Sequence, residues 1–289
     1  MTDQTYSRFG RVGIWSGALS RADAPAPEEN REAVAELEEL GYGTVWLGGS
    51  PLLDQVLPVL DATSRITVAT GILSIWRQDA ASVAAGLAKV DAPAADRFVL
   101  GLGTSHEAMT PGYTRPYSKM VSYLDELDAA PVPVPAGRRV LAALGPKMLK
   151  LSATRALGAH PYLVTVEHVA QARAELGPDA LLAPELGAVL DTDLGRARAT
   201  ARGALAPYLK MPNYTNNWLR RGFEEADLAD GGSDRLVDAL YVLGDLDAIR
   251  ARVDAFHAAG ADHVAVQALS ADGSLPRAQW RELAAALPL

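Results

Sequence analysis

The sequence of 289 residues contains no cysteine. A disulfide, a thiolate nucleophile and a zinc-thiolate site are therefore excluded, and we expect no metal site. No run of about 18 apolar residues occurs, which is the length that a membrane-spanning helix needs. The segment 1–8 is too polar for a signal peptide. These absences predict a cytoplasmic protein that does not enter a membrane.

Basic residues are also scarce. The 27 lysines and arginines are outnumbered by 35 acidic residues, so the net charge is −8. This balance argues against a nucleic acid or an anionic membrane surface as the partner. Hydrophobic residues make up 49% of the chain and charged residues 21%. The composition therefore predicts a globular protein with a large core and no disordered region.

Short apolar runs alternate with segments of helical spacing along the whole chain. Each unit spans roughly 30 residues, which is the length of a strand-helix-strand crossover. We predict eight strands, at 12–15, 44–47, 66–73, 98–102, 139–144, 159–164, 181–190 and 263–269. Eight such units predict a single α/β domain over 1–289 with the TIM (β/α)8 barrel fold, and an open doubly wound sheet is the alternative. The segment 211–243 carries no strand pattern and is predicted to be a helical insertion between the seventh and eighth units.

The segment Arg97 to His106 is the most informative one. Its apolar run, 98–102, is typical of a parallel strand that is covered on both faces. The run ends at Gly103, and four polar residues follow it, namely Thr104, Ser105, His106 and Glu107. Ligands collect beyond the carboxyl ends of such strands. A tight turn without a ligand explains the two glycines equally well.

Four segments, taken together, resemble those of bacterial luciferase-like oxidoreductases. They are Glu-Leu-Gly-Tyr-Gly-Thr-Val-Trp-Leu-Gly-Gly (39–49), Val-Ala-Thr-Gly-Ile-Leu (68–73), Arg-Phe-Val-Leu-Gly-Leu-Gly-Thr (97–104) and Leu-Gly-Pro-Lys-Met (144–148). Within that superfamily they are most similar to the branch that uses the deazaflavin coenzyme F420. The resemblance implies a TIM-like barrel that binds F420, or flavin mononucleotide (FMN), at the carboxyl ends of its strands. It also implies hydride transfer to or from a small-molecule substrate, and a homodimer.

The resemblance assigns roles to two segments. Gly71-Ile72 falls where the family often holds a non-proline cis peptide that supports the cofactor ring. His106 falls where similar deazaflavin enzymes carry a glutamate that serves as an acid or polarises the substrate, and Glu107 is the neighbouring candidate. Histidine suits this role because its ordinary pKa of about 6.5 lets it exchange a proton near neutrality.

The segment after the second strand departs from the family pattern. Sugar-phosphate and alcohol dehydrogenases of the family carry an acidic residue followed by a histidine, and this chain has Gly49-Ser50 instead. Gly48 and Gly49 permit close approach of a ring, whereas Ser50 can donate a hydrogen bond but is a poor base. That particular dehydrogenase chemistry is therefore in doubt.

Gly145, Pro146 and Lys147 open a predicted helix after the fifth strand. The free amides of a helix N-terminus and the lysine ammonium favour an anion, such as a cofactor phosphate. An ordinary helix start with a surface lysine is the alternative. The basic candidates for contact with the acidic tail of F420 are Arg77, Arg115, Lys119, Arg138 and Arg139. Trp15 and Trp76 either line a substrate pocket or pack in the core.

Three classes of function follow. The leading one is an F420-dependent oxidoreductase with His106 or Glu107 as the proton-transfer group. The second is an FMN-dependent luciferase-like monooxygenase, and the third is a barrel that binds cofactor without turnover. The residues predicted to bind the cofactor are Gly48, Gly49, Ser50, Gly71, Ile72, Gly103, Thr104, Ser105, Gly145, Pro146 and Lys147.

Overall fold

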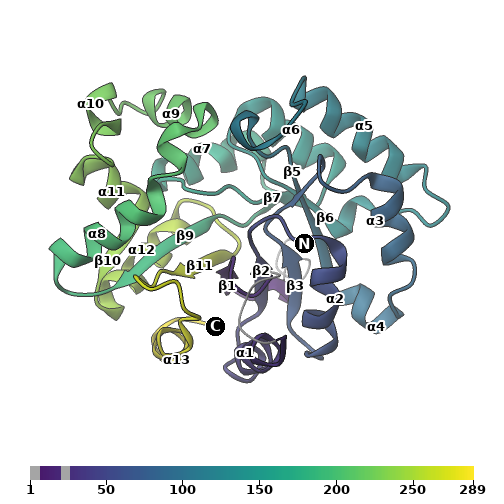
Figure 1. Ribbon diagram of the computed structural model, residues 1–289, viewed down its shortest axis with the longest axis horizontal. Helices are drawn as coiled ribbons and strands as arrows, with labels where there is room; N and C mark the ends of the chain where they lie inside the picture. The colour runs from purple at the N-terminus through teal and green to yellow at the C-terminus, as the bar shows by residue number, and fades with distance from the viewer. Residues whose placement is uncertain (1–6, 21–26) are drawn as a thin grey trace.

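The computed structural model describes residues 7–20 and 27–289. Its helices surround a curled parallel sheet (Figure 1). The principal strands in the described residues are β1 (Val12–Ser16), β2 (Thr44–Leu47), β3 (Thr67–Thr70), β5 (Phe98–Gly103), β6 (Arg139–Leu141), β7 (Gly158–Ala159), β8 (Leu181–Leu182), β9 (Glu185–Leu190) and β11 (Val264–Ala268). Their burial is nearly continuous, as the apolar runs predict for strands that are covered on both faces.

The strands follow the order of a TIM barrel. β1 pairs with β2, and the ladder continues through β3, β5, β6 and β7 to β8. Ala183 and Pro184 alone separate β8 from β9. The amide of Glu185 donates to Pro161 O on one side, and the amide of Ala265 donates to Pro184 O on the other. Because β9 pairs with β11 and β11 pairs with β1, the interrupted strand joins the two ends of the sheet. The predicted barrel architecture is confirmed.

Several predicted boundaries are wrong. The third strand breaks after Thr70 and resumes as β4 (Leu73–Ser74), and the fifth and sixth strands end earlier than expected. The segment 241–244 is a strand, β10 (Tyr241–Gly244), where the spacing predicted the end of a helix. Tyr241 lies opposite Gly187 of β9. Aromatic and β-branched residues suit a strand, and the free edge of β9 offers the pairing that overrides the helical pattern.

The helices cover the outside of the sheet. Their bounds are α1 (Pro27–Glu39), α2 (Leu53–Asp61), α3 (Ala80–Leu87), α4 (Ala92–Arg97), α5 (Pro116–Asp128), α6 (Pro146–Arg155), α7 (Val166–Leu176), α8 (Leu194–Leu205), α12 (Leu246–Ala258) and α13 (Arg277–Ala286). Asp79, Asp193 and Asp245 each accept a backbone N–H of the helix that follows, which satisfies one of its free donors. In the part of the chain that is described, no helix is long and apolar enough to cross a membrane.

A group of short helices stands between α8 and β10. It consists of the 3-10 turn η4 (Tyr208–Lys210), α9 (Pro212–Leu219), α10 (Glu225–Leu228) and α11 (Asp234–Leu240). In Figure 1 α9, α10 and α11 gather at one side of the barrel, in green. Trp218 of α9 is buried, and its Nε1 donates to Leu163 O at 3.3 Å. This contact fastens the group to the loop after β7.

The barrel interior is filled by side chains from alternate strands. Trp46 stacks on His160 with ring centroids 4.1 Å apart, and its Nε1 donates to His263 Nε2 at 3.0 Å. Phe9 packs on the other side of Trp46. The interior is therefore a packed core, and a ligand site is confined to its carboxyl-terminal mouth.

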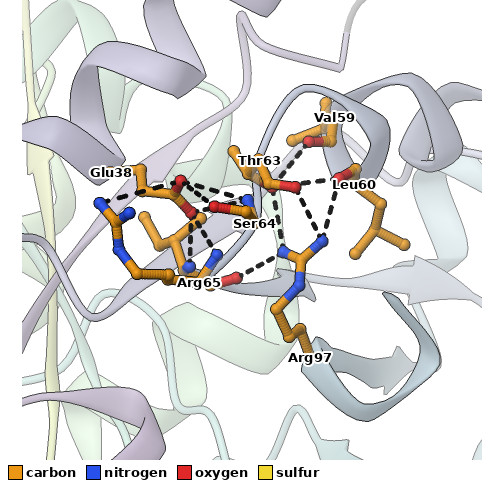
Figure 2. A network of polar contacts seen from close by, with 8 residues as sticks. Glu38, Val59, Leu60, Thr63, Ser64, Arg65 and Arg97 are labelled. Carbon is orange, nitrogen blue, oxygen red and sulfur yellow. Dashed lines mark hydrogen bonds and ion pairs between the residues drawn. The ribbon is translucent and has the colours of Figure 1, made fainter. Parts of the chain in front are cut away.

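Two charged side chains fix the turn between α2 and β3 (Figure 2). The guanidinium of Arg97 donates to the carbonyl oxygens of Leu60, Thr63 and Ile66 at 3.0–3.1 Å. The Glu38 carboxylate accepts the backbone N–H groups of residues 64, 65 and 66. Arg97 therefore anchors the start of the third strand, which carries Gly71 to the mouth of the barrel.

Candidate active site

The predicted cofactor segments lie at one edge of the sheet. They follow β2, β3, β5 and β6, and parallel neighbouring strands end at the same edge. Backbone bonds continue past the strand ends, since Gly48 N donates to Ser16 O and Gly71 N donates to Leu47 O. The structure thus brings the segments 48–50, 71–72, 103–106 and 142–145 to the mouth of the barrel.

Trp15 fills the centre of this mouth. Its side chain is 8% exposed, and its Nε1 donates to Gly71 O at 3.0 Å. A Cβ atom on Gly48 would lie 2.2 Å from the indole, and one on Gly71 would lie 2.8 Å from Nε1. The packing of Trp15 therefore accounts for both glycines. Gly49 is different, because the nearest atom to a Cβ there is 3.7 Å away and the residue is exposed.

The bond between Gly71 and Ile72 is cis, which confirms the prediction made from the resemblance. The Ile72 side chain packs against the end of β5, where a Cβ on Gly103 would lie 2.5 Å from Ile72 Cδ1. Gly103 is therefore required by its protein neighbour. On the next loop, Trp76 Nε1 donates to Thr104 O at 2.7 Å, and this bond holds the chain that leads to His106.

His106 is half-buried in the mouth, whereas Glu107 is exposed. The imidazole lies 5.3 Å from the Tyr214 ring, between centroids, and its Nδ1 is 3.5 Å from Asn213 Nδ2. Both partners come from α9, in the segment 211–243. Burial lowers the pKa of His106, so the imidazole is neutral at pH 7. Of the two proposed proton-transfer residues, His106 has the environment of a functional group.

A group of four tyrosines lines the opposite side of the mouth, and we call it the tyrosine wall: Tyr162, Tyr208, Tyr214 and Tyr241. Ring centroids are 5.5 Å apart for Tyr162 and Tyr208 and 5.1 Å apart for Tyr208 and Tyr214. Trp15 lies 5.1 Å from Tyr162, so the row of rings continues into the centre of the barrel. Tyr162 also donates to Gln267 Oε1 at 2.9 Å. No motif in the sequence predicts this wall.

A carboxyl group is buried beneath the tyrosine wall. Glu185 is 1% exposed; its Oε2 accepts the amide of Leu163 at 3.1 Å, and its Oε1 has no partner. Burial raises the pKa of Glu185 to about 8, against the opposing effect of the Leu163 hydrogen bond. The group is therefore neutral at pH 7. This residue was also missed, although a carboxylate within an apolar strand is a visible signal.

The start of α6 presents the predicted anion site. The N-cap residue is Gly145, which has no side chain to accept a hydrogen bond from the first amides of the helix. Pro146 occupies the first turn, and Lys147 is exposed. A Cβ on Gly145 would meet nothing within 4 Å, so the space beside this helix end is open. The residues fit an anion such as a phosphate.

The basic residues divide between the two edges of the barrel. Arg138 precedes β6 and Arg139 is its first residue, so both lie at the amino end of the strand, where Arg138 pairs with Asp96 and Arg139 with Asp128. Their predicted contact with a cofactor tail is therefore wrong, because the mouth lies at the other end of the strand. Arg115 is at the start of α5, on the side of the mouth.

Arg77 and Lys119 stand near the loops of the mouth. Arg77 donates to Ser50 O at 2.7 Å and thereby ties the loop after β2 to the loop after β4. Lys119 lies in the first turns of α5 and is partly exposed. No group of three or more histidine, aspartate or glutamate side chains in the described residues is arranged to hold a metal ion.

Residues 9–127 match the luciferase-like monooxygenase family. No curated protein matches the chain by sequence. Among solved structures, the chain resembles an F420-dependent secondary alcohol dehydrogenase in complex with an F420-acetone adduct, at a TM-score of 0.71 and 15% identity over 96% of this chain and 98% of that one. It also resembles the F420-dependent tetrahydromethanopterin reductase of Methanopyrus kandleri, at a TM-score of 0.72 and 15% identity over the same shares.

A third similar structure binds the other cofactor. The oxygenating constituent of 3,6-diketocamphane monooxygenase from Pseudomonas putida, in complex with FMN, has a TM-score of 0.65 and 11% identity over 95% of this chain and 96% of that one. At these identities the likeness shows that the fold is that of luciferase-like enzymes. The open positions at Gly49 and Gly145 and the uncapped start of α6 fit the ring and the phosphate of a flavin or a deazaflavin.

Proposed function

We propose that the protein is an oxidoreductase that moves a hydride between F420 and a small organic substrate. The observation that carries the proposal is the position of His106. Its neutral, half-buried imidazole stands in the mouth of a luciferase-like barrel, between the glycine-rich loops and the tyrosine wall. This is where a proton-transfer group must lie to act beside a ring that is bound at the strand ends.

The chain's own residues supply binding and proton transfer. The loop of Gly49 and Ser50 would border the ring, with Trp15 as the floor of the mouth. The start of α6 and Lys147 would hold the phosphate, through free amides and the ammonium charge. When bound, the deazaflavin supplies the carbon that accepts or gives the hydride.

His106 would manage the proton at the substrate oxygen. A neutral imidazole has one N–H donor and one acceptor nitrogen, so it can polarise a carbonyl or take the proton of a hydroxyl. Burial of His106 keeps it in this neutral form at pH 7. The group therefore supplies the function that Gly49-Ser50 lacks.

The alternative is an FMN-dependent monooxygenase. The likeness to the 3,6-diketocamphane enzyme supports it, because that structure contains FMN on the same fold. Ring and phosphate are common to both cofactors, so the mouth and α6 suit either.

A fluorescence titration of the cofactor-free protein with each cofactor tests the choice. We expect saturable binding of F420 and weaker binding of FMN. Micromolar binding of FMN with none of F420 would reverse the choice in favour of the monooxygenase. Binding of F420 without turnover of any carbonyl or alcohol would favour a non-catalytic barrel.

A further inference from the structure

Two polar side chains on neighbouring strands bind the segment 162–163 of the tyrosine wall, Glu185 of β9 and Gln267 of β11. Gly187 of β9 is flanked by Tyr241 on one strand and Gln267 on the other. The unpartnered Oε1 of Glu185 lies 3.5 Å from the position of a Cβ on Gly187. Gln267 accepts from Tyr162, and its Nε2 donates to no described residue. Buried polar groups are normally paired, so the unpartnered Oε1 of Glu185, near a Gln267 amide that is open to the mouth, points to a ligand that brings a polar atom.

The same place is accessible from the mouth. Tyr162, Tyr208 and Gln267 are each partly exposed, whereas Glu185 lies beneath them. Aromatic rings stack at centroid separations of 4.5–7 Å, and the row from Trp15 through Tyr162 to Tyr208 already has spacings of 5.1 and 5.5 Å. A flat ligand can extend this row, with its edge toward the Gln267 amide.

The groups around the tyrosine wall are uncharged, and this favours an uncharged ligand. The titratable groups that face Glu185 are the four tyrosines, whose pKa values burial raises further, so that they stay neutral. His106, which touches Tyr214, is neutral as well. No lysine or arginine of the described residues makes a hydrogen bond or cation–π contact with the wall. Among the described residues, no lysine or arginine is therefore bound to the wall where it could pair with an anionic ligand, and Glu185 is uncharged at pH 7.

We propose that the tyrosine wall is the substrate side of the mouth and takes an uncharged planar aromatic molecule, whose carbonyl or hydroxyl oxygen accepts a hydrogen bond from the Gln267 amide. Glu185 is a positioning residue: it holds the Leu163 amide beside Tyr162 and keeps the pocket uncharged. This inference rests on the proposed function, because it names the substrate class of the same site.

Three naphthalene probes of equal ring size test the class. 2-Acetylnaphthalene is a neutral ketone, 2-naphthoate is an anion and 2-naphthylmethylammonium is a cation. Calorimetric titration of the protein without added cofactor at pH 7 should give ketone binding at least about tenfold tighter than either charged probe. Equal or tighter binding of a charged probe overturns the proposal, and so does the absence of saturable ketone binding.

Variants locate the binding. Gln267→Leu should weaken ketone binding about fivefold or more, the value of one lost hydrogen bond, and Tyr208→Leu should weaken all probes that stack. Tyr117→Leu is the control, since Tyr117 is 41% exposed on α5 and outside the wall. Circular dichroism checks that each variant is folded. Unchanged ketone affinity in both folded wall variants refutes the location.

The pH dependence separates the role of Glu185 from mere packing. Ketone binding to the parent should weaken between pH 7 and 9 as the buried carboxyl ionises, whereas Glu185→Gln should bind the ketone with no such change. The same fall in both proteins contradicts the assignment. Because the probes are titrated without cofactor, their failure leaves the F420 titration unaffected, and failure of the F420 titration leaves the ketone result standing.

Discussion

Replacement of Glu185 by glutamine should remove a pH dependence of stability that the parent protein shows. Burial raises the pKa of Glu185 from the ordinary 4.5 to about 8. The folded state therefore holds a proton that the unfolded state releases above about pH 4.5. The contribution of this group is complete below that pH and is lost as the pH rises to 8.

The buried histidines have the opposite effect, since they make the stability rise with pH, and they do so at lower pH than Glu185. Burial lowers the pKa of His160 to about 4 and the pKa values of His168 and His263 to about 3; it also lowers those of His106 and His257. Their unfolded forms bind protons with a pKa of about 6.5, so the histidines reduce stability below that pH and, to a smaller extent, up to about pH 7.5. The histidine contributions are the same in the parent and in Glu185→Gln, so the difference between the two proteins isolates Glu185.

The size of this pH dependence follows from the one proton that Glu185 holds in the folded state and releases in the unfolded state. Between pH 6.5 and 8, each pH unit lowers the contribution of Glu185 to the unfolding free energy by about 1.4 kcal/mol. The loss per pH unit becomes smaller as the pH approaches the folded pKa. Relative to Glu185→Gln, the parent should lose about 1.5–2 kcal/mol of unfolding free energy between pH 6.5 and 8. Urea denaturation at three pH values measures it, with Glu282→Gln on α13 as an exposed control. Parallel pH profiles in the parent and in Glu185→Gln would refute the reasoning.

Three further substitutions test the site. His106→Ala should lower turnover by about 10²-fold and change F420 affinity little, as steady-state kinetics and titration would show; unchanged turnover would remove the proton-transfer role. Lys147→Ala should weaken F420 binding about tenfold, and the parent should lose more affinity than the variant when salt is added; a salt-independent affinity in the parent would place the phosphate elsewhere. Gly71→Val should displace Trp15, because a Cβ there would lie 2.8 Å from Nε1; an unshifted tryptophan emission spectrum would contradict this packing.

The barrel and its glycine-rich edge are readable from the sequence because local signals dominate there. Continuous apolar runs that end at glycine mark strands buried on both faces, and the order of such strands decides which loops meet. The predicted ends of helices and strands are wrong where pairing with a neighbouring strand outweighs the local sequence pattern, as at Tyr241, which pairs with β9. Arg139 was misjudged for a different reason: it begins a strand, and the parallel topology itself puts that end opposite the mouth.

The tyrosine wall was beyond the sequence analysis because its members are far apart in the chain. Tyr162 lies after β7, Tyr208 in η4 and Tyr241 at the start of β10, so they come together only in the folded chain. Glu185 gave a partial signal, since a carboxylate in an apolar strand must be paired, neutral or functional. Its neighbours, which decide among these, are visible only in the folded chain.

The central claim is that F420 binds over the glycine-rich edge of the mouth, and two open glycines beside β6 test it. Gly145 is at the carboxyl end of this strand and Gly137 at the amino end, and a Cβ at either meets nothing within 4 Å. Both positions can therefore accept tryptophan without a clash at Cβ. Fluorescence titration with F420 should show binding to the parent and to Gly137→Trp and little or none to Gly145→Trp. Equal affinity of the two variants for F420 would contradict the account.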